Sequence, residues 1–98
     1  MSVVPNRDSR YAPGRTRPFD FRRASHRRIR AAVFTRDAFT CRSCGFRPDA
    51  VPDDYDGRFT VGGLHLDHVL PRCAGGSRAL DNLQVLCASC NSSKSGTL

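Results

Sequence analysis

Two pairs of cysteines constrain this 98-residue chain more than any other feature. Cys41 and Cys44 enclose two residues, Cys87 and Cys90 repeat that spacing, and 42 residues separate the pairs. Each spacing lets a tight turn direct two thiolates at one tetrahedral ion, so the pairs predict a structural zinc site with four sulfur ligands. A site closed in this way has no open position for catalysis. A redox-active dithiol and an oxidised pair are the alternatives.

The hydrophobic core of such a chain is small and needs this support. The length allows one domain at most, hydrophobic residues make up 39% of the sequence, and tryptophan is absent. Zinc binding energy would then become folding energy. Since the sequence contains neither a signal peptide nor a membrane span, we expect a cytoplasmic protein, in which paired cysteines favour metal over disulfides. Cys73 lies outside both pairs and is expected to be a free thiol.

The excess positive charge is confined to the first third of the chain. Residues 1–36 hold ten arginines and two aspartates, whereas residues 37–98 hold six basic and seven acidic residues. This asymmetry predicts contact with nucleic acid, mostly through phosphates; solubilising charge is the alternative. Three prolines and the lack of apolar periodicity predict a flexible basic arm over residues 1–23, followed by one folded domain over residues 24–98.

The domain begins with an amphipathic helix over about 25–36. Ser25 is its expected N-cap, Ile29 and Val33 lie on its apolar face, and its arginines fall largely on the other faces. His26 is expected either to contact phosphate or to be a first-turn residue.

The rest of the pattern predicts a small α+β domain. Residues 46–59, rich in proline and aspartate, predict an exposed connection. Residues 61–71 and 83–87 have the alternation of strands on either side of a glycine-containing loop, and a short helix follows from Ala88.

A second set of motifs lies between and just after the cysteine pairs. It comprises Asp67-His68-Val69-Leu70-Pro71, Gly75-Gly76, Asn82-Leu83, and Leu86-Cys87-Ala88-Ser89-Cys90-Asn91 followed by Lys94. In this order the motifs closely resemble the HNH endonucleases, specifically those with two CxxC knuckles, over roughly residues 25–95. The resemblance implies a ββα-metal (His-Me finger) fold, in which a two-stranded antiparallel hairpin and one helix surround a catalytic divalent ion.

The resemblance also implies a role for four polar residues. Asp67 matches the first metal ligand, and His68 matches the general base that deprotonates the attacking water. Asn91 stands where the family usually has histidine and would bind the same ion through its amide oxygen. Asn82 matches the central asparagine and is expected to bond backbone groups across the hairpin loop and so fix where His68 points. One carboxylate and one amide oxygen suit Mg²⁺ or Mn²⁺.

Three neighbouring residues have two interpretations each. Arg72 and Lys94 either approach the scissile phosphate or lie solvated at the surface. His65 projects from the same strand face as Asp67; it is expected to be a partly buried histidine without a catalytic role, and approach to the metal or the DNA is the alternative.

The implied function is a metal-dependent DNA endonuclease that nicks or cleaves by in-line attack of water, leaving 5′-phosphate and 3′-hydroxyl ends. A non-catalytic zinc-knuckle module that binds nucleic acid and a partner-dependent nuclease subunit are the alternatives. The resemblance extends to small proteins encoded by bacteriophages near DNA-packaging genes and to defence and mobile-element nucleases. Phage packaging proteins and a second copy of the chain are therefore candidate partners.

Overall fold

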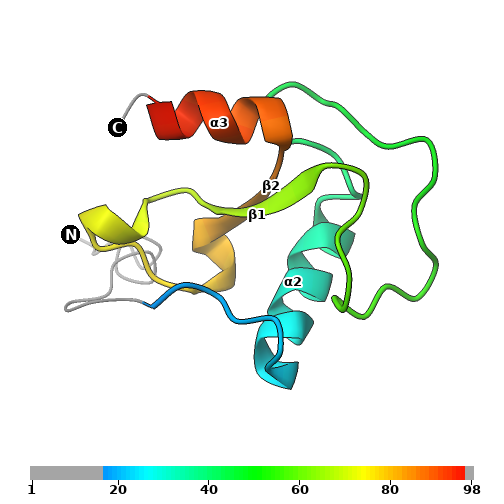
Figure 1. Ribbon diagram of the computed structural model, residues 1–98, viewed down its shortest axis with the longest axis horizontal. Helices are drawn as coiled ribbons and strands as arrows, with labels where there is room; N and C mark the ends of the chain where they lie inside the picture. The colour runs from blue at the N-terminus through cyan, green and yellow to red at the C-terminus, as the bar shows by residue number, and fades with distance from the viewer. Residues whose placement is uncertain (1–16, 97–98) are drawn as a thin grey trace, which may run out of the picture.

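The computed structural model describes residues 17–96, with side chains through Lys94, and has the predicted small α+β architecture. It contains two helices and one two-stranded sheet: α2 (Ala24–Arg36), β1 (Leu64–His68), β2 (Leu83–Cys87) and α3 (Ala88–Gly96). Two 3₁₀ turns, η1 (Arg72–Ala74) and η2 (Leu80–Asn82), lie in the loop that joins the strands. The hairpin lies between the two helices (Figure 1). No described helix is long and apolar enough to cross a membrane.

The two strands form an antiparallel hairpin, as predicted. Leu64 lies opposite Cys87, Asp67 opposite Gln84, and His68 opposite Leu83. The first strand is shorter than the predicted 61–71, because residues 62–63 form a turn before it and the chain bends away after His68. The last two residues of β1 are therefore Asp67 and His68, with which the second set of motifs begins.

The core lies between α2 and the hairpin. Val33 and Phe34 of α2 are buried against Leu83 and Val85 of β2. The connection over residues 46–59 has no helix or strand, as predicted, yet its Tyr55 stacks on Phe34 with ring centroids 5.5 Å apart. This long connection thus closes the core where a larger domain would use another helix or strand.

The helix α2 differs from the prediction in its N-cap and in the burial of Arg30, and it confirms one of the two interpretations of His26. Its N-cap is Arg23 instead of Ser25, and no side chain caps it. His26 is a first-turn residue and is 7% exposed, so the alternative of a phosphate contact is wrong. The prediction that Arg30 lies on a solvent-facing side of the helix is also wrong: Arg30 is 6% exposed, and its Nε donates to the Gly57 carbonyl at 2.9 Å.

The sequence gives no sign that Asp37, which follows α2, is buried. Its carboxylate is fully buried and accepts hydrogen bonds from Arg36, from Arg42 and from the backbone N–H of Val85 at 3.0 Å. These contacts lower the pKa of Asp37 against the opposing effect of burial. The carboxylate therefore fixes the end of α2 to the middle of β2.

The predicted basic arm is only partly described. Its last residues, 17–23, run along the domain (Figure 1), and Phe19 packs against the core. Residues 1–16 lie outside the described part of the chain, so the flexible arm and the domain boundary remain predictions.

Candidate functional site

The four paired cysteines lie together, as their spacing predicts. Cys41 and Cys44 come from the turn after α2, Cys87 ends β2, and Cys90 lies in the first turn of α3. All four sulfur atoms lie within 4.8 Å of one another, and those of Cys44 and Cys87 are 3.7 Å apart. A tetrahedral zinc–sulfur site with bonds of about 2.3 Å has edges of roughly 3.8 Å, so the cluster fits zinc.

Backbone hydrogen bonds hold the first pair in position for this site. The Cys41 N–H donates to the Phe46 carbonyl at 2.8 Å, and the Gly45 N–H donates to the Cys41 carbonyl at 2.9 Å. Gly45 has φ of 83°, which a residue with a side chain rarely adopts. The Arg42 N–H donates to the Val85 carbonyl at 2.9 Å and so joins the turn to β2.

The protonation of the cluster favours binding of a cation. Burial raises the pKa of Cys41, but backbone N–H groups outweigh this effect and lower that pKa to about 6. The Ser43 hydroxyl lowers the pKa of Cys90, but the neighbouring thiols outweigh it and raise that pKa to about 12. A thiolate at Cys41 is thus favoured near neutral pH, and a bound cation would favour deprotonation of Cys90 as well. None of the five cysteines forms a disulfide, and Cys73 is exposed outside the cluster.

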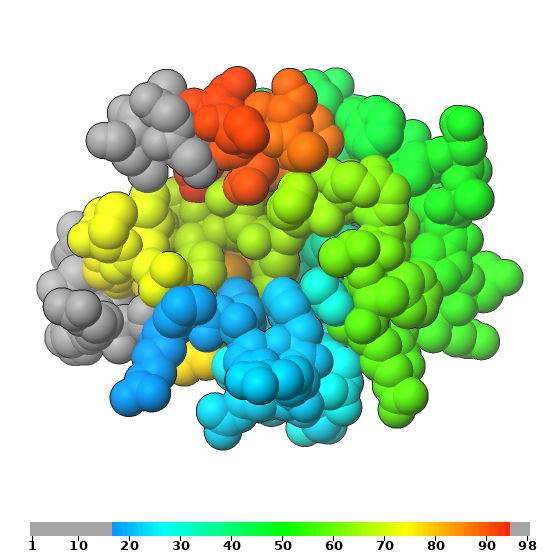
Figure 2. Space-filling view, viewed as in Figure 1, coloured from blue at the N-terminus to red at the C-terminus, as the bar shows by residue number. Residues whose placement is uncertain are grey.

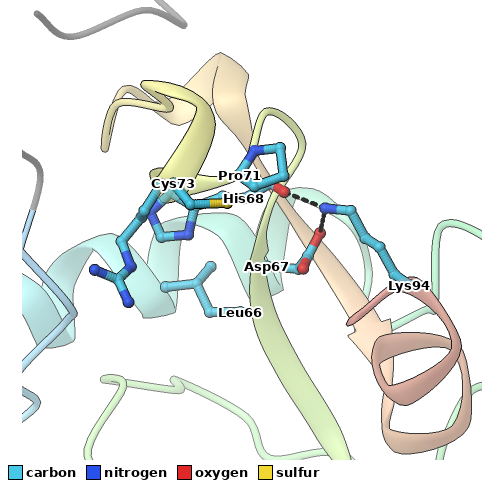
Figure 3. Close-up of a pocket in the computed structure, with 7 residues that line it drawn as sticks. Leu66, Asp67, His68, Pro71, Cys73 and Lys94 are labelled. Atoms are coloured by element: carbon cyan, nitrogen blue, oxygen red, sulfur yellow. Dashed lines mark hydrogen bonds and ion pairs between the residues drawn. The ribbon is translucent and has the colours of Figure 1, made fainter. Parts of the chain in front are cut away.

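A separate cleft lies where β1 ends, between η1 and α3. Its volume is about 350 Å³. Figure 2 shows β1 at the floor of a hollow, with α3, the loop after β1 and the first described residues around it. The residues that line the cleft are Leu66, Asp67, His68, Pro71, Arg72, Cys73 and Lys94 (Figure 3).

The Asp67 carboxylate already binds a positively charged group. The Lys94 ammonium donates to its Oδ2 at 2.7 Å and also donates to the His68 carbonyl. The Gln84 amide, opposite Asp67 in the hairpin register, donates to the same Oδ2 at 3.0 Å. Of the two interpretations of Lys94, an isolated solvated charge is therefore wrong, since its side chain joins α3 to the end of β1.

The His68 imidazole lies on the other side of β1. Figure 3 shows it beside Cys73, while the Asp67 carboxylate faces Lys94, as expected for consecutive residues of a strand. Burial, and next the charge of Arg72, lower the pKa of His68 against the opposing effect of Asp67. Its Nε2 is buried without a hydrogen-bond partner. A neutral imidazole with an unpaired nitrogen is therefore present at neutral pH.

Asn82 is fully buried in the loop that connects the strands. Its Oδ1 accepts from the Leu70 N–H at 2.7 Å, and its Nδ2 donates to the carbonyls of Leu70 and Ser77 at 3.1 and 2.9 Å. Its own carbonyl accepts from the Val69 N–H at 2.7 Å. These bonds cross the loop and hold the two residues that follow His68.

The remaining predicted residues, Asn91 and His65, are not among the residues that line this cleft. Asn91 is half-buried on α3, three residues before Lys94 and so on the same helix face. His65 is exposed, so the prediction of a partly buried histidine is wrong; its side chain borders a second groove, which is lined in part by His68 and Arg72.

Sequence reasoning missed two contacts at the site. Gln84 contacts Asp67 through the hairpin register, and alternation along both strands could have indicated it. The Phe19 ring lies against the His68 imidazole, with centroids 5.5 Å apart. No signal in the sequence points to that contact, because 48 residues separate the two rings along the chain.

The model of the HNH endonuclease family matches residues 41–97, which span both cysteine pairs and the cleft. No curated protein and no solved structure gives a significant match.

Proposed function

Since the chain belongs to the HNH endonuclease family, we propose that it is a metal-dependent DNA endonuclease that acts in the cleft at the end of β1. The observation that carries this proposal is the presence of Asp67, His68 and Lys94 in one cleft within the matched segment. A carboxylate, an imidazole and an ammonium group together supply the charges that phosphodiester hydrolysis needs. A domain that only bound nucleic acid would not need this combination.

His68 is the general base of the proposed reaction. Its lowered pKa keeps the imidazole neutral and able to accept a proton at neutral pH. The attacking water gives a proton to His68, its oxygen forms a bond to phosphorus, and the bond from phosphorus to the 3′ oxygen breaks. The products carry 5′-phosphate and 3′-hydroxyl ends, the latter after the leaving oxygen takes a proton from solvent.

Asp67 and Asn91 are the proposed ligands of the catalytic ion. Asp67 is the carboxylate that lines the cleft, and a cationic group, the Lys94 ammonium, lies against it. Oxygen ligands suit Mg²⁺ or Mn²⁺, which when bound would polarise a phosphate oxygen and neutralise the charge on the leaving oxygen. Because Lys94 shares Asp67 Oδ2, the ammonium competes with a metal ion for that oxygen.

The DNA backbone is the proposed substrate surface. Arg72 lines the cleft, and Arg23 and Arg28 are exposed at the start of α2. Contacts of this kind hold phosphates without reading bases, so we expect low sequence specificity and affinity that falls steeply with salt. Nicking is the simplest outcome, because one site cuts one strand per encounter.

The test is cleavage of supercoiled plasmid by the zinc-loaded wild type and by His68→Ala. Each protein is assayed with Mg²⁺, with Mn²⁺ and without an added divalent ion, since a strong chelator would also remove the structural zinc. The matched control is His65→Ala, an exposed histidine on the same strand. We expect metal-dependent nicking by the wild type and the control, and loss of nicking in His68→Ala with unchanged zinc content and DNA affinity.

Two outcomes would contradict the proposal. Cleavage by His68→Ala at the wild-type rate would mean that another group accepts the proton. Absence of cleavage by the wild type with either metal, despite DNA binding, would favour a binding module or a subunit that requires a partner.

A further inference from the structure

The segment before α2 is held firmly against the domain. The Asp20 N–H donates to His26 Nδ1 at 2.8 Å. The Arg27 guanidinium donates to the carbonyls of Phe21 and Arg22 at 3.1 and 2.8 Å. These bonds fix the backbone of three consecutive residues, 20–22, to the first turns of the helix.

Aromatic packing fixes the side chains of the same segment. The Phe19 and Phe21 rings stack, with centroids 5.6 Å apart and planes 9° apart. The Arg30 guanidinium lies 3.7 Å from the centroid of the Phe21 ring and is itself anchored to the Gly57 carbonyl. A buried cation over a ring is a favourable contact, so Phe19 rests on a rigid support.

This support places Phe19 against His68. The two ring centroids are 5.5 Å apart and the planes are tilted by 34°. His26 meets another side of Phe19 edge-on, with centroids 5.4 Å apart. In Figure 2 the first described residues border the hollow above β1, on the side opposite α3. The segment therefore forms one wall of the site.

On this side an aromatic ring contacts the imidazole of His68. Nε2 of His68 has no hydrogen-bond partner, so no such bond at that atom sets the rotation of the ring. The backbone bonds of Asn82 hold the residues after His68 but do not touch its side chain. The Phe19 ring is the aromatic neighbour that contacts the imidazole face among the described residues.

We propose that Phe19 is a positioning residue that holds the His68 imidazole in its catalytic orientation, and that the segment that carries it, residues 19–21, belongs to the active site. This inference rests on the proposed function of His68. Displacement of a reacting group by about 1 Å can cost about a hundredfold in rate. Loss of the Phe19 ring should therefore lower kcat and leave DNA affinity nearly unchanged.

The test compares Phe19→Leu with Phe19→Tyr in the full-length, zinc-loaded protein. Leucine keeps an apolar side chain against the core but removes the ring, whereas tyrosine restores the ring. Phe46→Leu is the matched control, because Phe46 is an exposed phenylalanine outside the site. Plasmid nicking gives kcat and KM, and NMR of the imidazole C–H groups reports on the rings directly, since the chain has three histidines.

For Phe19→Leu we expect kcat to fall by about tenfold to a hundredfold with KM within twofold of the wild type. The His68 signals should lose the shift caused by the neighbouring ring, and Phe19→Tyr should restore both properties. Unchanged kcat and unchanged His68 signals in Phe19→Leu would overturn the inference. The NMR measurement needs no cleavage, so a protein that fails to cut DNA still decides whether Phe19 holds His68.

Discussion

Replacement of Asn82 by alanine should destabilise the domain more than any exposed substitution in the same loop. The side chain is fully buried and makes three hydrogen bonds to the backbone of Leu70 and Ser77. A net value of about 1 kcal/mol for each bond gives a loss of about 3 kcal/mol. That is a large share of the roughly 5–15 kcal/mol by which small domains are stable.

The assay is urea unfolding followed by circular dichroism at a fixed free zinc concentration, because bound metal adds to the apparent stability. Leu80→Ala is the matched control, since Leu80 lies in the same 3₁₀ turn and is 50% exposed. We expect its free energy of unfolding to change by no more than about 0.5 kcal/mol.

Asn82→Asp separates hydrogen bonding from shape. The aspartate side chain has nearly the same volume and can still accept from the Leu70 N–H, but it cannot donate to the two carbonyls. We expect it to be destabilised as well. A loss below about 1 kcal/mol in Asn82→Ala, or wild-type stability in Asn82→Asp, would refute the reasoning.

Three further predictions concern charge and metal. Asp37→Ala should lower the free energy of unfolding by about 3 kcal/mol. This is near the lower end for a broken buried ion pair, because both arginine partners are partly exposed. Thermal unfolding at constant zinc would show the loss, and an unchanged melting temperature would contradict it. Lys94→Met should tighten Mn²⁺ binding by about fivefold, as expected for loss of a competing ion pair of about 1 kcal/mol. Electron paramagnetic resonance of free Mn²⁺ measures the affinity. Weaker binding in the variant would mean that Lys94 does not compete for Asp67. Cys41→Ser should lose the bound zinc, whereas Cys73→Ser should retain it, and metal analysis of the two purified variants would distinguish them.

The sequence predicts the parts of this fold that depend on local spacing. Two residues between cysteines fix the geometry of each metal-binding turn, and so the cluster of Cys41, Cys44, Cys87 and Cys90 follows from the sequence. Alternation along the strands and the apolar spacing in the first helix are equally local. The register of the hairpin then follows from its buried face, since a shift by one residue would expose it.

The sequence does not predict which charged side chains are buried. From their residue type alone, Asp37 and Arg30 are expected at the surface, because burial of a lone charge is costly. In the folded chain Arg30 is satisfied by the distant Gly57 carbonyl. Asp37 has the neighbouring Arg36 and Arg42 as partners, but the contact that attaches it to the hairpin comes from the distant N–H of Val85. A local pattern contains no information about the distant partners, Gly57 and Val85.

The buried and bonded arginines also change how the excess positive charge of residues 1–36 is interpreted. Arg27 and Arg30 are bound to carbonyl groups, and Arg36 donates to the carbonyl of Leu83 at 2.6 Å. These arginines already bond backbone carbonyl groups, in the case of Arg30 a buried one, so they are not available to DNA phosphates without loss of those bonds. Net charge therefore overstates the number of phosphate contacts that the described residues can make. The arginines of α2 link the N-terminal segment, the long connection and the hairpin, and through Phe19 they support the position of His68.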